Sequence, residues 1–189
     1  MIPTAETERK LINKAQQGDK QAFGELVRFH HQGVINVVYR MCGDAQVAED
    51  AAQDAFIRAW QNLPGYKPQS AFRNWLYRIA VNAALDMLRR EPKYAEDIDE
   101  IPLASPGIRP EGAIIQAELS LQIQQAVLSL PKASRSVLIL REYEGLTYRD
   151  IANTLDIPLG TVMSRLNYAR NRLRDILAPR MEQMETNHV

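Results

Sequence analysis

The sequence predicts an all-α protein made of two small helical domains joined by a flexible acidic linker. Apolar residues recur every three or four positions along most of the chain, and no alternating strand pattern of any length is found. Residues 91–112 interrupt this pattern with four prolines and six acidic residues, a composition that cannot assemble a packed core. We therefore expect an N-terminal domain (1–90), the linker (91–112), a C-terminal domain (113–180) and a tail (181–189).

The formal net charge of the 189-residue chain is zero, but the charges are unevenly distributed. Residues 1–95 carry 13 lysines and arginines against 10 acidic residues, and residues 119–180 carry 9 against 5. Residues 96–118, between them, carry 1 against 6. Two mildly basic blocks thus flank an acidic one, so the zero average does not argue against binding to nucleic acid.

The residue types required for catalysis, metal binding or secretion are largely missing. Cys42 is the only cysteine, and it shows no metal-ligand spacing with the three histidines. We find neither a nucleophile–base set nor a glycine-rich phosphate loop. No signal peptide is recognised, and no apolar run approaches the roughly 18 residues of a membrane span. We expect a cytoplasmic protein that is not an enzyme and uses no cofactor or metal.

Two helices are expected before residue 44. Apolar residues at positions 11–15 predict a short first helix that ends at Gly18. Asp19 is expected to cap the second helix, Gly33 to kink it and Gly43 to end it.

Two further helices complete the N-terminal domain. Asp44 is expected to cap a helix that runs to about Leu63, and Ser70 to cap the next one. Their expected buried faces are Ala48, Ala52, Ala55, Phe56, Ala59 and Leu63 on the former, and Phe72, Leu76, Ile79, Ala83 and Met87 on the latter.

The outer faces of these two helices are candidate binding surfaces. Opposite the buried stripe of the helix after Asp44 lie acidic and amide side chains around one isoleucine, a pattern that fits either a partner surface or a solvated face with one stray apolar residue. Trp75, Arg78, Asn82 and Arg89 line one side of the next helix and could track single-stranded nucleic acid, although Trp75 also fits a core position.

Residues 145–177 predict a helix-turn-helix. Thr147 caps the first helix, the segment 156–158 breaks the chain at a proline, and Thr161 is expected to cap the second. The inward positions are Ile151, Ala152 and Leu155 on the first helix and Val162, Leu166, Ala169, Leu173 and Leu177 on the second. Helices that support this motif are expected at 114–130 and 134–143.

The outer face of the second helix suits the major groove of DNA. At about 100° per residue, Ser164, Asn167, Tyr168 and Asn171 lie opposite the apolar stripe. This polar centre is flanked by Arg165 and Arg172 on one side and by Arg170 and Arg174 on the other. Such a face can read base edges and hold phosphates on both sides. The alternative is an ordinary solvated helix rich in arginine.

Four segments of the sequence carry a family resemblance. The helix-turn-helix region contains LREYEGLTYRDIA and GTVMSRLNYAR, and it resembles the C-terminal promoter-reading domain of the extracytoplasmic-function (ECF) sigma factors of bacterial RNA polymerase. Upstream, AEDAAQDAFIRAW resembles the segment that docks on the coiled coil of the polymerase β′ subunit. SAFRNWLYRIAVNAALD resembles the segment that opens and captures the −10 promoter element. The resemblance covers roughly residues 6–178.

The resemblance implies polymerase contacts at the β′ coiled coil and the β flap, duplex and single-stranded promoter DNA as ligands, and an anti-sigma factor as regulator. The implied docking residues are Asp50, Gln53, Asp54 and Ile57. The residues implied for the unpaired −10 strand are Tyr66, Lys67, Trp75, Arg78 and Asn82. Those implied for the −35 element are Gly160, Thr161, Met163, Ser164, Arg165, Asn167, Tyr168 and Arg172, with Arg141 on a backbone phosphate.

The sequence departs from the usual family pattern at four of these positions. Asp54 stands where many relatives have glutamate, and Tyr66 where many have phenylalanine, which preserves a ring able to stack on an extruded base. Many relatives have arginine at Tyr168 and a basic residue at Met163, so we expect a different base preference. The family also implies that the linker threads the RNA channels of the polymerase and that the regulon serves stress or envelope responses; a plain solubilising spacer is the alternative for the linker.

Two other classes of protein compete with this interpretation. A stand-alone helix-turn-helix regulator would carry a ligand-sensing or receiver-like α/β domain in front, and the lack of strand patterns counts against it. A protein–protein adaptor would leave the arginines around Asn167 without a purpose.

Overall fold

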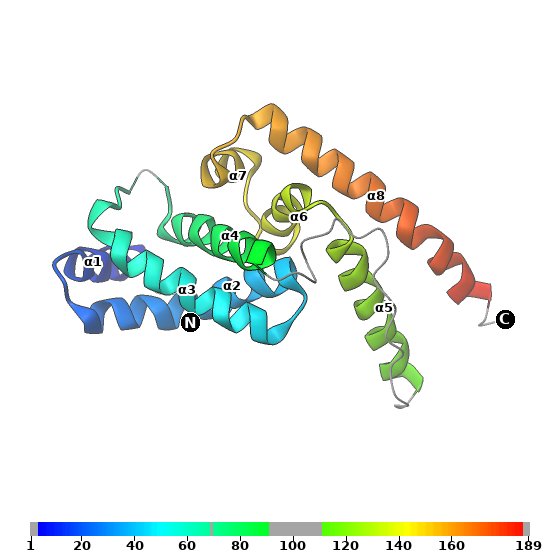
Figure 1. Cartoon of the computed structure of the whole chain (residues 1–189), viewed down its shortest axis with the longest axis horizontal. Helices are drawn as coiled ribbons and strands as arrows, with labels where there is room; N and C mark the ends of the chain where they lie inside the picture. Colours follow the sequence, from blue (N-terminus) through cyan, green and yellow to red (C-terminus); the bar gives the residue numbers. More distant parts are fainter. Residues whose placement is uncertain (1–3, 69, 91–110, 187–189) are drawn as a thin grey trace.

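The computed structural model describes residues 4–68, 70–90 and 111–186, and within these ranges every regular element is helical (Figure 1). The predicted all-α class is confirmed. No helix in the described part of the chain is long and apolar enough to cross a membrane.

The N-terminal half consists of four helices: α1 (Ala5–Gln16), α2 (Lys20–Cys42), α3 (Ala45–Asn62) and α4 (Phe72–Arg90). A short 3₁₀ turn, η1 (Leu63–Gly65), follows α3. Helices α2, α3 and α4 pack against one another, and α1 lies across α2.

Three of the predicted helix ends are confirmed. The Asp19 carboxylate accepts hydrogen bonds from the first backbone N–H groups of α2 at 2.9 and 3.0 Å. Gly43 ends α2 in the left-handed region at φ +75°, and Asp44 caps α3. The predicted cap at Ser70 is wrong, because α4 begins only at Phe72.

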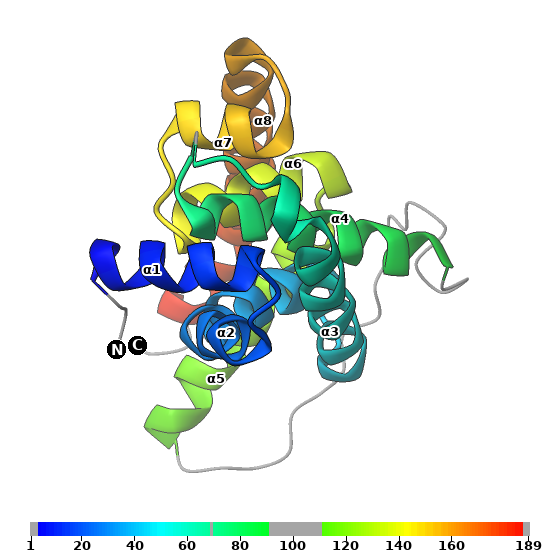
Figure 2. The same ribbon diagram turned by 90° about the vertical axis from the view of Figure 1, so that its left-hand side faces the viewer.

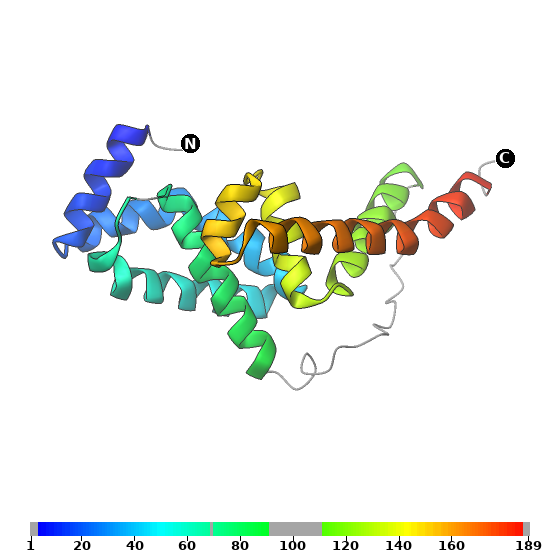
Figure 3. The ribbon, with the colours of Figure 1, turned by 90° about the horizontal axis from the view of Figure 1, so that it is seen from above.

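The C-terminal half consists of α5 (Glu111–Leu128), α6 (Lys132–Leu138), a π-helical turn η3 (Ile139–Tyr143), α7 (Tyr148–Leu155) and α8 (Leu159–Thr186). Helix α8 begins next to α7 and runs away from α1 to the opposite end of the molecule (Figure 3). The predicted linker lies outside the described residues except for its last two positions, which begin α5.

The helix-turn-helix is formed as predicted except for one cap. The Thr147 hydroxyl accepts the backbone N–H of Asp150 at 3.1 Å, and the Asp150 carboxylate accepts the backbone N–H of Thr147 at 3.3 Å, which makes a capping box. Asp156 ends α7 with φ +55°. Thr161 does not cap α8; it lies in the first turn, where its N–H donates to the Pro158 carbonyl at 2.9 Å.

Gly33 does not interrupt α2, which is continuous through this position. A Cβ atom added at Gly33 would lie 2.6 Å from the hydroxyl oxygen of Tyr77. The missing side chain therefore lets Tyr77 of α4 approach the backbone of α2.

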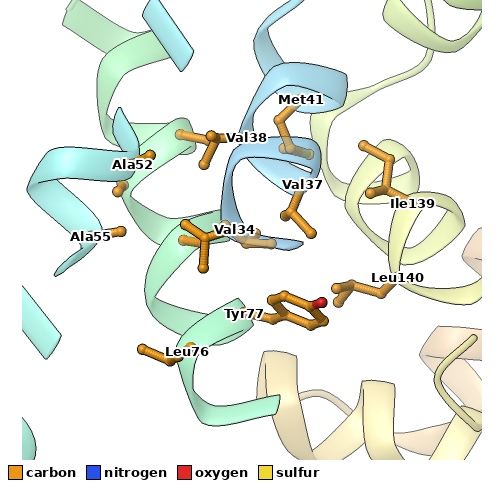
Figure 4. Packing of buried hydrophobic residues seen from close by; sticks show 14 of the residues in the cluster. Val34, Val37, Val38, Met41, Ala52, Ala55, Leu76, Tyr77, Ile139 and Leu140 are labelled. Carbon is orange, nitrogen blue, oxygen red and sulfur yellow. The ribbon is translucent and has the colours of Figure 1, made fainter. Parts of the chain in front are cut away.

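The two halves share one buried core. Val37 and Met41 of α2 and Tyr77 of α4 point toward Ile139 and Leu140 of η3 (Figure 4). All five side chains are buried, and this contact continues the core between α2, α3 and α4. The two predicted helical domains are therefore packed against each other in this structure.

A buried arginine strengthens this joint. The Arg135 guanidinium of α6 donates to the Met41 carbonyl at the end of α2, at 2.6 Å, and to the Leu130 carbonyl at 2.9 Å. It also donates to the carbonyl of Leu128, whose side chain packs against Gly43. A buried carbonyl at the end of α2 is thereby satisfied by a cation from the other half, and the same guanidinium holds two carbonyls at the end of α5.

Candidate nucleic-acid interface

Helix α8 presents the polar face that the sequence predicts. Val162, Leu166 and Ala169 are buried, while Ser164 and Asn167 are exposed. Met163 is 53% exposed and Tyr168 49% exposed, although both are large and partly apolar. The start of the helix is open as well, because a Cβ added at Gly160 would meet no atom within 4 Å.

The four arginines of α8 differ in their exposure and in their contacts with other side chains. Arg172 is exposed, and Arg165 is half-buried. Arg170 donates from Nη2 and Nε to one carboxylate oxygen of Glu142 in η3, at 2.6 and 3.2 Å, and this hydrogen bond raises the pKa of Arg170. Arg174 bonds to Asn171 at 3.2 Å. Arg170 and Arg174 thus contact other side chains of the protein, while Arg172 is exposed.

Arg141 contacts the turn that precedes α7 and so stabilises the helix-turn-helix. Its Nη1 donates to the Leu146 carbonyl at 2.9 Å, and its guanidinium lies 5.2 Å from the ring centroid of Tyr148. The side chain is half-buried. These contacts fix the turn before α7, so any phosphate contact by Arg141 uses only the part of the guanidinium that stays open.

The candidate strand-capture site, formed by the loop after α3 and by α4, is built on three packed rings. Tyr66 is only 7% exposed; its ring centroid lies 5.4 Å from that of Phe72 and 5.0 Å from that of Trp75. The Tyr66 hydroxyl donates to the Ser70 carbonyl at 2.8 Å. In this conformation the Tyr66 ring is covered and anchors the loop, so it does not offer a face for base stacking. Trp75 is half-buried in the same cluster, which agrees with the core alternative.

The exposed members of this site are Lys67, Arg78 and Asn82. Lys67 and Arg78 line a cavity of about 780 Å³ that lies between α4 and the turn of the helix-turn-helix. Arg78 Nη2 lies 3.2 Å from the carboxylate of Asp156, at the C-terminal end of α7. Figure 2 shows α7 and the start of α8 above α4. The strand-capture site and the helix-turn-helix thus face each other.

The candidate docking face on α3 is only partly exposed, and one of its carboxylates is paired. Asp50 and Gln53 are exposed, and Ile57 is 50% exposed. Asp54 is half-buried and pairs with Arg58 at 2.7 Å. Arg58 also reaches Asp86 of α4 at 2.6 Å, and this hydrogen bond raises the pKa of Arg58.

An apolar groove adjoins the docking face. It has a volume of about 700 Å³ and runs between α2 and α3. Its lining combines Gln53 and Ile57 of the docking face with aromatic and aliphatic side chains, including Phe23, Val27, Ile35, Phe56 and Trp60. The sequence pattern did not indicate it, because it placed Phe56 in the core and gave no outer face for α2.

Comparison with known proteins decides the family. Residues 26–93 match the model of sigma-70 region 2, and residues 120–173 match that of sigma-70 region 4. The RNA polymerase sigma-H factor of Pseudomonas aeruginosa is 39% identical, covering 95% of this chain and 98% of that protein. The chain belongs to the ECF sigma factors of RNA polymerase. Its role is promoter-specific initiation of transcription.

Other relatives of this sigma factor agree. The ECF sigma factor SigW of Bacillus subtilis is 36% identical over 88% of this chain and 94% of its own length. The solved structure of CnrH, in complex with the cytosolic domain of CnrY, aligns with a TM-score of 0.68 at 25% identity, covering 92% of this chain and 98% of that chain. In the sigma factor, the region 2 match includes the docking face and the strand-capture site, and the region 4 match includes the helix-turn-helix up to residue 173. Among the described residues, no group of three or more His, Cys, Asp or Glu is placed to hold a metal ion.

Proposed function

We propose a division of labour in which residues 1–90 dock core polymerase and capture the unpaired −10 strand, while residues 113–180 read the −35 element. The observation that carries this proposal is that the chain has two separate polar, arginine-bearing faces, one on α8 and one around Arg78. The polymerase supplies the chemistry of RNA synthesis, and this chain selects where synthesis starts.

At the −35 element, we assign base reading to Ser164, Asn167, Met163 and Tyr168. An asparagine can hydrogen-bond an adenine edge in a bidentate manner, and an exposed apolar side chain can contact a thymine methyl group. Arg172 is assigned to a phosphate, which positions the helix without reading sequence. Gly160 lies in the open first turn of α8, where backbone N–H groups favour an anion. Thr161 is assigned to the same anion through its hydroxyl, because its N–H donates to the Pro158 carbonyl.

At the −10 element, Lys67 and Arg78 are the cations that hold the strand backbone, and Asn82 is the amide that contacts an unpaired base. The ring cluster of Tyr66 and Trp75 supports this face from below. Unstacking a base step costs about a few kcal/mol, so capture of the unpaired strand must offset that cost for the promoter to open.

The two faces cannot serve one promoter in the arrangement described here. The −35 and −10 elements are centred about 25 base pairs apart, which is roughly 85 Å of duplex at about 3.4 Å per pair. In this structure Arg78 of one face lies 3.2 Å from Asp156 of the helix-turn-helix. The 20 residues between α4 and α5 can span at most about 70 Å when extended, enough to let the halves separate. We call the arrangement in which the two halves are packed together the closed form. We therefore propose that binding to core polymerase separates the two halves and so opens the closed form.

Permanganate footprinting tests the assignment. Thymines around the start site of a duplex promoter are expected to become reactive when the chain and core polymerase are both present, and to remain unreactive with the chain alone. Melting by the free chain, or none with either, would contradict the proposal.

We also propose a regulatory partner of the anti-sigma type in the cytoplasm, and a stress or envelope-response regulon. The complex of the relative CnrH with CnrY supports this, as does the apolar groove beside Ile57. An inhibitor seated in that groove would cover Gln53 and Ile57, so it and core polymerase should compete for the free chain.

A further inference from the structure

The last residue of α1 reaches the loop that precedes the strand-capture site. The side-chain Nε2 of Gln16 donates to the Leu63 carbonyl at 3.0 Å and to the Tyr66 carbonyl at 2.8 Å. The first carbonyl belongs to the residue that begins η1 and the second to the residue that follows η1, and the two contacts join positions that are 47 and 50 residues apart in sequence. A glutamine amide has two N–H donors, so both are used to hold this turn.

A second contact ties the same helix to the ring cluster. Glu8 lies two turns before Gln16 on α1, and its carboxylate is 2.8 Å from Nε2 of the buried His30. The His30 ring packs edge-on against Phe72 at 5.5 Å between centroids. Phe72 in turn packs against Tyr66. Helix α1 is therefore fixed to the cluster at one end and to the η1 turn at the other.

We propose that Gln16 is a positioning residue of the strand-capture site, and that α1 is a structural part of this site. The sigma-70 region 2 match begins only at residue 26 and so does not include α1. Gln16 holds the carbonyl of Tyr66, and Lys67 follows directly, so the hydrogen bonds set the path of the backbone that presents Lys67 to the strand. Without them the loop must be ordered when the strand binds, which weakens capture. This inference rests on the proposed −10 function.

The test compares two adjacent glutamines in the full chain bound to core polymerase. Gln16→Glu replaces the donor with a carboxylate that faces two carbonyl oxygens. Gln17→Glu makes the same charge change at an exposed position. The measured quantities are the affinity for a single-stranded −10 oligonucleotide, the affinity for a duplex with only the −35 element, and the melting temperature of the free chain.

Gln16→Glu is expected to weaken binding of the single strand about fivefold or more, with −35 binding equal to that of Gln17→Glu. Gln16→Lys restores a donor and is expected to recover much of the loss. The methionine side chain of Gln16→Met has a similar length and no donor. If Gln16→Glu unfolds, the single-strand and −35 affinities of Gln16→Met are compared with those of Gln17→Glu instead. Equal single-strand affinity of the Gln16 and Gln17 variants would overturn the inference, as would equal losses at both promoter elements. Failure of the wild-type holoenzyme to bind the single strand would instead reject the −10 function itself.

Discussion

Tyr77 on α4 donates a hydrogen bond to Glu144, which directly follows η3, and this bond joins the two halves of the molecule. Tyr77 is only 3% exposed. Burial, together with the bond to Glu144, raises the pKa of Tyr77, so the hydroxyl keeps its proton and remains a donor. The closed arrangement thus contains another specific polar contact across the joint, in addition to the one between Arg135 and the Met41 carbonyl.

Tyr77→Phe should weaken the closed form. The substitution removes the donor and leaves the half-buried Glu144 carboxylate without it, at an expected cost of about 1–3 kcal/mol. We expect a larger radius of gyration of the free chain by small-angle X-ray scattering. Tyr168→Phe removes a hydroxyl from an exposed position and serves as the control. Identical scattering of both variants and wild type would show that the bond does not hold the halves together.

Gly33 should tolerate no side chain. Gly33→Ala places a methyl group 2.6 Å from the Tyr77 hydroxyl, whereas Gly24→Ala, in the same helix, meets no atom within 4 Å. We expect Gly33→Ala to lower the free energy of unfolding by about 1–3 kcal/mol and Gly24→Ala to raise it by about 0.5–1 kcal/mol. Urea denaturation measures both. A gain in stability from both substitutions would mean that Tyr77 shifts without cost.

His30 should make the stability depend on pH. Burial lowers the pKa of His30 below its usual value of about 6.5, although contact with Glu8 opposes this shift and Arg73 adds to it. The unfolded chain therefore takes up the proton more readily than the folded one. The contribution of His30 is complete above the unfolded pKa and is lost as the pH falls through the folded value.

The measurement is the free energy of unfolding between pH 7 and 5. We expect the slope in this range to be smaller in His30→Gln than in wild type. His31→Gln, at the neighbouring exposed position, should keep the wild-type slope. An unchanged slope in His30→Gln would assign the pH dependence to other groups.

The docking face is best tested at Ile57. Its side chain is half exposed, so Ile57→Asp should abolish binding to core polymerase with less than about 0.5 kcal/mol lost in stability. Asp54→Arg should also block binding, but it breaks the ion pair with Arg58 and puts two cations together, so a loss of about 1 kcal/mol is expected as well. Pull-down with core polymerase and thermal melting separate the two effects, with Leu121→Asp as an exposed control outside this face. Normal binding by Ile57→Asp would move the docking site elsewhere.

Local features of the chain could be predicted because local chemistry sets them. Asp19, Gly43, Asp44 and Thr147 each fix a helix end through neighbours close in sequence. The buried positions Val162, Leu166 and Ala169 follow directly from helical periodicity. This explains why the order of the helices and the exposed face of α8 agree with expectation.

Contacts between distant segments could not be predicted in this way. The sequence gives α4 one apolar stripe, yet Tyr77, Val81 and Ala84 outside that stripe are also buried, because the helix is covered on more than one side. Gln16 is an ordinary polar residue at a helix end, and only the fold brings it to the carbonyl of Tyr66. The buried state of Tyr66 has the same origin, since its partners Phe72 and Trp75 belong to the following helix.

Two residues on the exposed face of α8 should have different effects on DNA recognition. Asn167 is assigned to a base edge, so Asn167→Ala should change the ranking of −35 sequences and cost about 1–3 kcal/mol on the preferred one. Arg172 is assigned to a phosphate, so Arg172→Ala should weaken binding to all sequences alike. It should also reduce the slope of log affinity against log salt by about 1.

The measurement is holoenzyme affinity for a panel of −35 variants at several salt concentrations. Arg28→Ala, which removes an exposed arginine of α2 outside the helix-turn-helix, is the control and should leave both the ranking and the salt slope unchanged. Equal losses across the panel from both Asn167→Ala and Arg172→Ala would contradict the assignment, because a base reader must discriminate between sequences and a phosphate contact cannot.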